Sequence, residues 1–572
     1  MSELGLGVGT NVTSLDKAAR LELLHRVGIA LTAEKNRDRL VEMILLEAKQ
    51  LCNADGGTLY IRTDEDTLRF AIMRTDSLSI ALGGTTGREI ELPEIPLYDA
   101  ETKAKNLRNV ATAAALLRRS INIPDAYDAE GFDFSGTKQF DERNAYRSRS
   151  FLTIPLYNTE SRVIAVLQLL NARDAAGKVV PFSDEVERIV QALASQAGIA
   201  LDNQMLLDGQ RKLLESFIKL IAAAIDAKSP YTGGHCERVP VLTEMLAESL
   251  CRADTGPFKS FRLTEEEWYE LRIAAWLHDC GKVTTPVHVM DKATKLETIS
   301  DRIDTVRARF EVLRRDAELR ALKRQLAGEP AEAAQATLGA ELAQLDEELA
   351  FLERANTGGE FLAPELKARI REIGARRLRQ GEREVPLLSD DELENLCISR
   401  GTLTEAERLI INGHMVQTIQ MLEALPFPRN LARVPEYAGG HHEKMDGGGY
   451  PRGIYAGDMS VPARIMAIAD VFEALTADDR PYKRAKRLSE AMSIMGYMKQ
   501  DNHLDPELFD HFVRSQTYLR YAESYLDPGL IDAVDEAALL AITPRPFELP
   551  PEEARVQRKR EFLPEYRARP KP

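Results

Sequence analysis

The sequence predicts a multidomain protein with a mixed α/β unit first, a long linker helix next, and a mostly helical unit last. Three observations lead to this fold class. At 572 residues the chain is too long for one hydrophobic core. Strand-like segments occur within the first 205 residues. Helical apolar spacing dominates most of the chain after that, so two to four domains are expected.

The α/β unit is expected over residues 20–205, after an N-terminal extension at residues 1–19. It should begin with a helix at 38–54. Four segments then have the composition of strands, namely 56–63, 67–74, 150–158 and 163–172. A long helix should start near Ser183, which offers an N-cap followed by first-turn acids.

Two stretches of this unit, residues 149–172 and 182–204, resemble a GAF domain. The resemblance implies a sensory α/β fold whose antiparallel sheet is flanked by helices. Five residues also resemble the pattern of cyclic-nucleotide-binding GAF domains, with a shorter spacing from Phe to Asp: Asn171, Lys178, Phe182, Asp184 and Glu185. These residues are candidates for binding a ligand, and a structural role is the alternative.

The long helix should continue beyond the α/β unit as a linker over residues 206–228. Ten positions along it are spaced alternately three and four apart, and eight of them are apolar, as in a parallel coiled coil: Val190, Leu193, Ala197, Ala200, Gln204, Leu207, Arg211, Leu214, Ile218 and Ile221. Two interpretations stay open. The helix packs on its own domain, or it pairs with a second copy and makes a homodimer.

Composition narrows the possible partners. The formal net charge of -15 argues against sequence-independent binding to nucleic-acid polymers or anionic membranes. No apolar run approaches the roughly 18 residues that span a bilayer, and the N-terminus has no secretion signal. The five cysteines include no CxxC pair, which fits a reducing compartment. We therefore expect a cytoplasmic protein.

The mostly helical part should contain an insertion over residues 296–400. Heptad-spaced apolar residues on either side of "GEP" at 328–330 predict an antiparallel helical hairpin, followed by an irregular charged segment. The tail at 544–572 is rich in Pro, Arg and Glu, so we expect it to be extended or loosely docked. Two helices open on the Thr-x-x-Glu pattern of a capping box and lead to a histidine: Thr264 with Glu267, and Thr404 with Glu407.

The segment "HDCGK" places His278 and Asp279 at the end of a helix. Adjacent helical side chains project about 100° apart, so this pair cannot bind one ion side by side. An Asp carboxylate has two oxygens, however, and can bridge two cations while the imidazole binds one. Lys282 follows three residues after Asp279, where it could meet an anion. Alone, this dipeptide would be an ordinary surface pair.

Other segments add to this pair. His235 follows two glycines, His414 ends a capped helix, and "HHEKMDGGGYP" at 441–451 contains two adjacent histidines. Asp470 lies on an apolar helix, where an unpaired carboxylate would be costly to bury. A metal ion would remove that cost.

The ordered set H…HD…H…HH…D resembles the HD-GYP family of metal-dependent phosphohydrolases, and residues 441–451 match its HHExxDGxGYP signature. "RIMAIADVFEALT" and "DRPYK" match as well. The resemblance implies an all-α HD-GYP domain over residues 229–543, interrupted by the insertion. It carries seven metal ligands over to this chain: His235, His278, Asp279, His414, His441, His442 and Asp470.

The resemblance also implies the cofactors. Asp279 would bridge two divalent ions, and the family uses iron or manganese, which an N/O donor set without thiolate suits. Some members hold a third metal through a Glu four residues before the first His. Tyr231 occupies that position here, so two metals are expected.

The implied substrate is cyclic di-GMP, opened to linear pGpG and then cut to GMP, with a cyclic GMP-AMP dinucleotide as the alternative. Two cations about 3.5–4 Å apart would activate a water for attack on the phosphodiester. Asp279 and Lys282 would be catalytic, with Lys282 neutralising phosphate charge. Arg480 and Lys483 match substrate-binding positions, although one extra residue precedes Arg480. A catalytically weak signalling adaptor is the competing hypothesis.

The signature loop provides the last candidates, which are Glu443, Asp446, Gly447, Gly449, Tyr450 and Pro451. Glu443 should either orient a ligand imidazole or lie on the surface. In related proteins this loop has been linked to contacts with diguanylate cyclases. The insertion falls between "HDCGK" and His414, so we expect it near the mouth of the active site, as a lid, a dimer contact or a passive addition.

Overall fold

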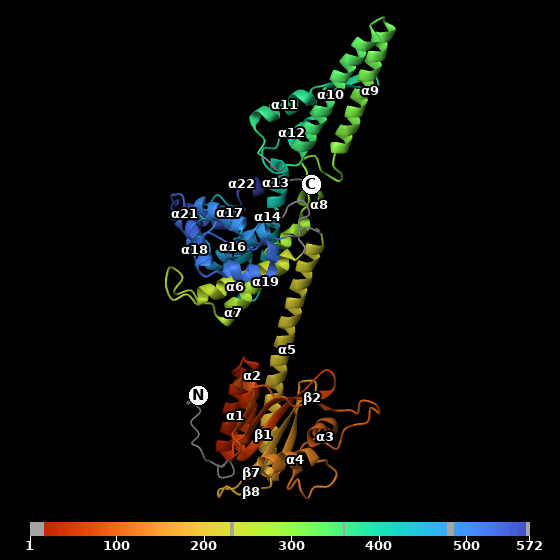
Figure 1. Ribbon diagram of the computed structural model, residues 1–572. Helices are drawn as coiled ribbons and strands as arrows, with labels where there is room; N and C mark the ends of the chain where they lie inside the picture. Colours follow the sequence, from red (N-terminus) through yellow and green to blue (C-terminus); the bar gives the residue numbers. More distant parts are fainter. Residues whose placement is uncertain (1–16, 229–233, 359–360, 478–484, 568–572) are drawn as a thin grey trace. The chain divides into compact units, whose positions relative to one another are not determined.

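The computed structural model describes residues 17–228, 234–358, 361–477 and 485–567. They form two compact units, Met1–Leu213 and Leu214–Pro572, each considered by itself (Figure 1). Tyr231, Arg480 and Lys483 lie outside the described residues. Within the described ranges, no helix combines the length and apolar character needed to cross a membrane.

The first unit is built on one antiparallel sheet in the order β3-β2-β1-β7-β6-β5, with β4 beside β2 and β8 beside β7. Its centre pairs β1 (Ala54–Arg62) with β7 (Val163–Arg173) in antiparallel register. The other strands are β2 (Thr67–Thr75), β3 (Ile80–Gly83), β4 (Ile95–Pro96), β5 (Ile121–Ile123), β6 (Phe151–Tyr157) and β8 (Val179–Val180). The expected α/β fold with an antiparallel sheet is confirmed.

Helices cover both faces of this sheet (Figure 1). Successive strand residues point to opposite faces, so Leu59 joins one core and Tyr60 the other. The first core lies under α1 (Lys17–Ala33), α2 (Arg37–Leu51) and the start of α5 (Asp184–Lys228). The second involves α3 (Val110–Leu117), and α4 (Ser135–Asn144) belongs to the same unit.

Helix α5 is continuous over 45 residues, and the apolar positions expected to form its seam differ in burial along the helix. Val190, Leu193, Ala197 and Ala200 are buried in the core of the first unit, as the packing interpretation requires. Farther along, Leu207 is 53% exposed, Leu214 38% and Ile221 44%, whereas Ile218 is buried in the second unit. The coiled-coil interpretation stays a prediction, and it concerns the exposed positions Leu207, Leu214 and Ile221.

The second unit has a helical core that includes α16 (Val461–Thr476), most of whose residues are buried. Both expected capping boxes are present, at Thr264 and Thr404. The surrounding helices are α6 (His235–Cys251), α7 (Glu265–Leu277), α8 (Val287–Met290), α13 (Glu405–Asn412), α14 (His414–Glu423), α15 (Val434–Gly439), α17 (Leu488–Gln500), α18 (Pro506–Arg514), α19 (Thr517–Tyr525) and α20 (Glu536–Ala541).

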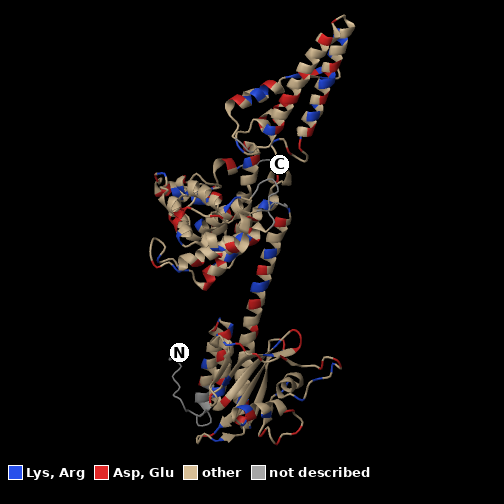
Figure 2. Cartoon of the chain, viewed as in Figure 1, with Lys and Arg blue, Asp and Glu red and all other residues tan. Residues whose placement is uncertain are grey.

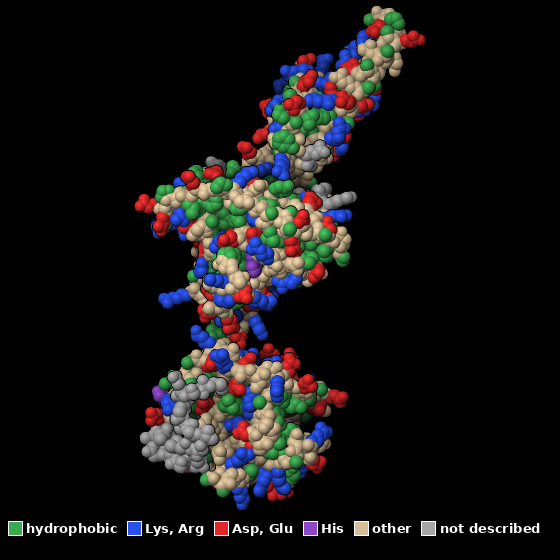
Figure 3. All heavy atoms as spheres, turned by 60° about the vertical axis from the view of Figure 1, so that its left-hand side comes forward, with side chains coloured by type: hydrophobic (Ala, Val, Ile, Leu, Met, Phe, Trp, Pro, Cys, Tyr) green, Lys and Arg blue, Asp and Glu red, His purple; other side chains and the backbone are tan. Residues whose placement is uncertain are grey.

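The insertion contains the expected hairpin, α9 (Ile303–Leu326) and α10 (Ala331–Asn356). Figure 2 shows both charge signs along these helices, and cross-hairpin ion pairs such as Arg307 with Glu353 use them. The charged segment after it forms α11 (Pro364–Gly374), β9 (Arg377–Gln380), β10 (Arg383–Pro386) and α12 (Asp390–Leu396). Figure 3 shows acidic and basic side chains intermingled on the face drawn.

The tail differs from the expected extended chain, because it contains α21 (Glu552–Arg560) and α22 (Pro564–Arg567). Helix α21 carries acids in its first turn and bases in its last, which favours a helix through its dipole. The tail is also docked: Arg555 and Lys559 pair with Asp458 at 2.7 and 2.9 Å.

Candidate metal centre

Five segments of the second unit bring the seven sequence-predicted ligands together. His235 opens α6 directly after Gly234, whose φ of 80° suits glycine. His278 and Asp279 follow α7, and Asp470 lies on α16. The remaining ligands are His414 at the start of α14 and the pair His441 and His442 after α15.

Gly281 explains how two of these segments approach each other. A Cβ at this position would lie 2.0 Å from the backbone oxygen of His414, so only glycine fits. Its N–H donates to the Thr418 hydroxyl at 2.9 Å. The glycine of "HDCGK" therefore lets α14 pack on the turn that carries Asp279.

The ligand atoms fall into two groups that share Asp279, and within each group they lie within 4.8 Å of one another: Asp279, His414, His441 and His442; and His235, His278, Asp279 and Asp470. The Asp279 Oδ1 lies 3.2 Å from the Nε2 of His414, whereas its Oδ2 lies 3.3 Å from the Nε2 of both His235 and His278. Each oxygen thus faces a different group, which is the arrangement of a bridging carboxylate.

The imidazoles are held with one nitrogen toward the site. The Nδ1 atoms of His278, His414 and His441 lie 2.6–2.8 Å from backbone oxygens of the preceding turn, to which an Nδ1–H donates. Their Nε2 atoms are buried and have no hydrogen-bond partner among the described residues. The Nε2 of His235 and the Oδ1 of Asp279 are buried in the same way. Buried polar atoms are costly without partners, so these donors fit metal ions.

Glu473 and Arg238 belong to the site, although the sequence analysis missed them. Glu473 is buried and hydrogen-bonded to the Nδ1 of His235, and its other oxygen accepts from Arg238 at 2.7 Å. A carboxylate on this Nδ1 fixes the ring and increases its basicity as a ligand. The available signal was the spacing, because Glu473 follows Asp470 by three residues on α16 and shares its face.

The charges of the site agree with its use as a metal centre. Burial, then the neighbouring His278, lowers the pKa of His441 to about 4, and burial with His441 holds the pKa of His442 well below its usual range. Both rings are therefore neutral and able to ligate near pH 7. Burial would raise the pKa of Asp279, but Lys282 and His278 hold it well below the ordinary value, so the bridge is ionised.

Lys282 lies at the edge of this cluster, ion-paired with the Oδ2 of Asp279. Burial would lower its pKa, but Asp279 and Asp470 raise it, so the ammonium remains charged. Of the three residues expected to contact substrate, Lys282 is the one that the structure describes.

The signature loop encloses a buried carboxylate. Glu443 accepts hydrogen bonds from the backbone N–H groups of Arg452 and Ile454 at 2.8 and 2.9 Å. Its hydrogen bonds therefore brace the loop, which differs from both the imidazole-orienting and the surface role considered for it. Burial raises the pKa of Glu443 to about 7, against the lowering effect of these N–H groups.

Three further loop residues explain the Asp-Gly-Gly-Gly sequence. The Asp446 carboxylate accepts from the Gly448 N–H at 2.9 Å. Gly447 has a φ of 76°, and a Cβ there would meet the Tyr455 ring. A Cβ on Gly449 would lie 2.3 Å from the Lys444 nitrogen. These residues therefore shape the loop.

The Tyr-Pro end of the loop joins the metal centre to the C-terminal tail. The Tyr450 ring stacks on His442, with centroids 4.9 Å apart and planes 17° apart. Pro451 follows a cis peptide bond, and its carbonyl accepts from the Leu563 N–H at 2.8 Å.

The five GAF candidates are arranged differently. Asn171 is buried with a φ of 53°, accepts from the Arg149 N–H and donates to the Tyr146 hydroxyl and the Arg147 carbonyl. Phe182 is buried in the core beneath α5. The side chains of Lys178, Asp184 and Glu185 are exposed, so the five are not gathered in one buried site.

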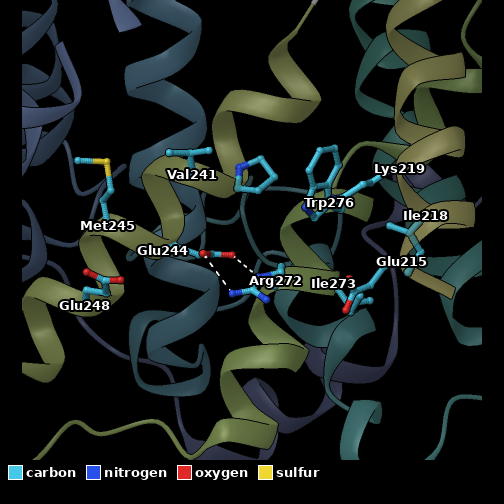
Figure 4. A pocket seen from close by; sticks show the side chains of 11 residues that line it. Glu215, Ile218, Lys219, Val241, Glu244, Met245, Glu248, Arg272, Ile273 and Trp276 are labelled. Atoms are coloured by element: carbon cyan, nitrogen blue, oxygen red, sulfur yellow. Dashed lines mark hydrogen bonds and ion pairs between the residues drawn. The ribbon is translucent and has the colours of Figure 1, made fainter. Parts of the chain in front are cut away.

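A separate pocket of about 380 Å³ lies between α5, α6 and α7 (Figure 4). The ion pair of Arg272 with Glu244 lies in it, and Lys219 lies over the Trp276 ring with its Nζ 5.6 Å from the centroid. None of the seven candidate ligands lines it.

Comparison with known proteins supports both halves of this description. The GAF domain family matches residues 36–201, and the HD domain family matches residues 387–508. The second match begins near the end of the insertion. It includes His414, His441, His442 and Asp470 and leaves out His235 and the "HDCGK" segment, which the insertion separates from it.

Three curated relatives illustrate the similarity. The Vibrio cholerae 3'3'-cGAMP-specific phosphodiesterase 1 is 42% identical over 23% of this chain and 30% of its own length. The 3'3'-cGAMP-specific phosphodiesterase 3 of Vibrio cholerae is 26% identical over 57% of this chain and 43% of its own length. A cyclic di-GMP phosphodiesterase of Thermotoga maritima is 36% identical over 21% of this chain and 32% of its own length. The chain spans less than half of each relative.

These matches agree with the ligand geometry and with the HHExxDGxGYP signature at residues 441–451. The chain therefore combines an N-terminal GAF domain with an HD domain, and the signature that resembles the HD-GYP family lies within the HD match.

Proposed function

We propose that this protein is a metal-dependent phosphodiesterase that hydrolyses cyclic di-GMP to linear pGpG, and then to GMP, under the control of its GAF domain. The observation that carries the proposal is the shared Asp279, whose two oxygens face two groups of buried, unpartnered imidazole nitrogens among the described residues. The alternative of a catalytically weak adaptor is less favoured, because all seven ligand positions are filled by suitable side chains.

His235, His278 and Asp470 would hold one divalent ion, and His414, His441 and His442 the other, with Asp279 common to both. Bound divalent ions lower the pKa of a coordinated water and stabilise charge on phosphate oxygens. Asp279 keeps the two ligand groups together, and Glu473 orients His235 through its Nδ1. The charged Lys282 at the edge of the cluster would neutralise the phosphate of the substrate. Arg480 and Lys483 remain predicted substrate contacts outside the described residues.

The donor set suits iron or manganese. It consists of five imidazoles and two carboxylates, the donors that these metals accept. Two cysteines adjoin ligands, but burial raises the pKa of Cys280 to about 11 and that of Cys236 further, so neither is a thiolate near pH 7.

A second candidate substrate is 3'3'-cGAMP. Two of the relatives described above carry that specificity in their names, and the other is named for cyclic di-GMP. Both substrates contain the same phosphodiester linkage, so the metal centre treats them alike. The difference must come from residues that contact the bases.

We propose that α5 connects the GAF domain to the HD domain and that the active form is a homodimer. The exposed apolar residues of α5 support pairing with α5 of a second copy: Leu206, Leu207, Leu213, Leu214, Phe217, Leu220 and Ile221. Sedimentation of the full chain measures this state. We place the enzyme in the cytoplasm, where free cysteines such as Cys52 and Cys236 stay reduced.

A diguanylate cyclase is a further proposed partner, through the Tyr-Pro end of the signature loop. In the structure the Pro451 carbonyl already accepts a hydrogen bond from the Leu563 N–H of the tail. Such a partner would therefore have to bind beside the tail or displace it.

The test combines metal analysis with a hydrolysis assay. Full-length protein loaded anaerobically with iron, or with manganese, should contain about two ions per chain and convert cyclic di-GMP or 3'3'-cGAMP to a linear dinucleotide. The ratio of kcat/KM for the two substrates decides between the candidates. Protein that holds two ions and hydrolyses neither dinucleotide would exclude the proposal.

A further inference from the structure

The C-terminal tail reaches the rim of the metal centre through one residue, Tyr566. Its ring lies 6.1 Å from that of Tyr450, with the planes 27° apart, and Tyr450 stacks on the ligand His442. Its hydroxyl accepts a hydrogen bond from the Asn412 side chain at 3.2 Å. Asn412 is two residues before the ligand His414, so Tyr566 bridges two ligand-bearing segments.

The tail is fixed in this place by several contacts. Arg558 donates to the Gly453 carbonyl at 3.0 Å and lies over the Tyr455 ring, and the Leu563 N–H donates to Pro451. Arg452 of the loop lies over the Phe562 ring, 5.2 Å from its centroid. These contacts join the signature loop to the tail directly before Tyr566's own helix, α22, and they hold its ring beside the loop.

The rings of His442, Tyr450 and Tyr566 thus form an aromatic row that leads outward from the metal ligands. Tyr450 and Tyr566 are each half-buried, so each keeps an accessible surface. A phosphodiester at the metal centre would place its attached nucleoside beside this row. Nucleobases stack on aromatic side chains with a gain that corresponds to about tenfold or more in affinity.

We infer that Tyr566 is a substrate-binding residue, which with Tyr450 forms an aromatic wall that receives one purine base of a cyclic dinucleotide. The inference rests on the proposed function and adds to it a base-binding element supplied by the tail. It assigns to the tail a role in substrate recognition and separates that role from the phosphodiester chemistry of the metal centre.

The test compares two substrates on three variants of the full-length, metal-loaded enzyme. One substrate is cyclic di-GMP, and the other is methyl 4-nitrophenyl phosphate, a diester without a nucleobase. Tyr566→Leu keeps an apolar side chain of similar length but removes the ring, and Tyr566→Phe keeps the ring but removes the hydroxyl. Val556→Ala, on the same tail and 38% exposed, is the matched control.

We expect Tyr566→Leu to lower the ratio of kcat/KM for cyclic di-GMP over the small diester by about tenfold, mainly through KM. Tyr566→Phe and Val556→Ala should keep this ratio within about twofold, and the metal content of every variant should equal that of the wild type. An unchanged ratio in Tyr566→Leu would overturn the inference. So would a higher ratio, which would mean that the tail obstructs the site, or a loss of metal from this variant.

Failure of the proposed function gives a different result. Wild-type enzyme would then hydrolyse the small diester and neither cyclic dinucleotide, and the inference would fall with it. Failure of the inference alone leaves wild-type turnover of the dinucleotide intact, and the ratio in Tyr566→Leu is then not lowered, or that variant has lost metal.

Discussion

Two clusters of buried polar side chains in this chain use their polar atoms in different ways. In the HD domain, the Nε2 atoms of His278, His414 and His441 are buried without partners among the described residues. In the GAF domain, Asn171 and Asp55 are also buried, but their side chains are bonded to the protein. The difference teaches that several unpartnered buried ligand atoms that converge on one place, rather than buried polarity alone, mark a candidate ligand site.

The same contrast explains why one resemblance led to a site and the other did not. Three candidate metal ligands, His278, His414 and His441, have the Nδ1 atom beside a backbone carbonyl, which leaves the Nε2 atom for a ligand. The side-chain oxygen of Asn171 instead accepts a hydrogen bond from the Arg149 N–H, and its amino group donates to the Tyr146 hydroxyl and the Arg147 carbonyl. The proposal that Asn171 binds a cyclic nucleotide would require these bonds to break.

The largest effect should come from Asp279→Asn, which keeps the shape of the bridge and removes its charge. Because both ligand groups share this residue, we expect metal content to fall from about two ions to below one per chain. Turnover should fall by at least about 10³-fold, since metal ions supply several kcal/mol of transition-state stabilisation. Elemental analysis and the hydrolysis assay measure both quantities.

Asp501→Asn serves as the control, because Asp501 is 54% exposed and pairs with Arg545 on the surface. It should match the wild type in both measurements. Full metal content and activity in Asp279→Asn would show that the two groups do not share a bridge.

A smaller effect should come from Glu473→Gln, which weakens the hold on His235. Loss of such a supporting carboxylate typically lowers metal affinity by about 10- to 100-fold. Competition of manganese with a chelator measures this affinity without any assay of activity. Glu490→Gln, at a 54% exposed ion pair with Lys486, is the matched control. Equal affinities in the two variants would remove Glu473 from the metal centre.

For the GAF cluster we expect an effect on stability. Asn171→Ala should destabilise the domain by about 1–3 kcal/mol, because it leaves buried N–H and C=O groups without partners. Hydrogen exchange in β6 and β7 of the full chain reports the local stability. Exposed Lys178→Ala should leave this exchange unchanged. If Asn171→Ala kept wild-type exchange and lost only control of catalysis, Asn171 would be a ligand residue after all.

The smallest effect concerns pH. Burial would raise the pKa of Asp55, but hydrogen bonds from Ser77 and Tyr146, with Arg173, lower it below its ordinary value of 3.8. The carboxylate therefore adds stability above that value, and the contribution is lost as the pH falls through the lower, folded pKa. The protection factors of the β1 amides, which correct for the pH dependence of the intrinsic exchange rate, should fall below about pH 4 in the wild type. Asp55→Asn should flatten this dependence, and an equally steep response would contradict the assignment.

Much of the molecule could be predicted because local sequence carries local information. The alternation of apolar and polar residues predicted the long strands, and the capping boxes located two helices. The ordered motif from His235 to Asp470 predicted the candidate metal ligands that the structure brings together. The short strands β4 and β8 were not predicted, because a strand of two residues is too short to show a periodic pattern. The prediction of an extended tail was wrong. Helix α21 is supported by ion pairs of Arg555 and Lys559 with Asp458, which lies far away in the sequence, so no local pattern reveals them.

The sequence by itself determined the two domain types and which side chains could bind metal. Only the tertiary structure decided how they are used. It directed the two oxygens of Asp279 toward different ligand groups and placed Glu473 behind His235. It also brought Tyr566 to Tyr450, 116 positions earlier in the chain. The physical reason is that residue type and spacing limit what a side chain can do, whereas packing between distant segments fixes which of its atoms remain free.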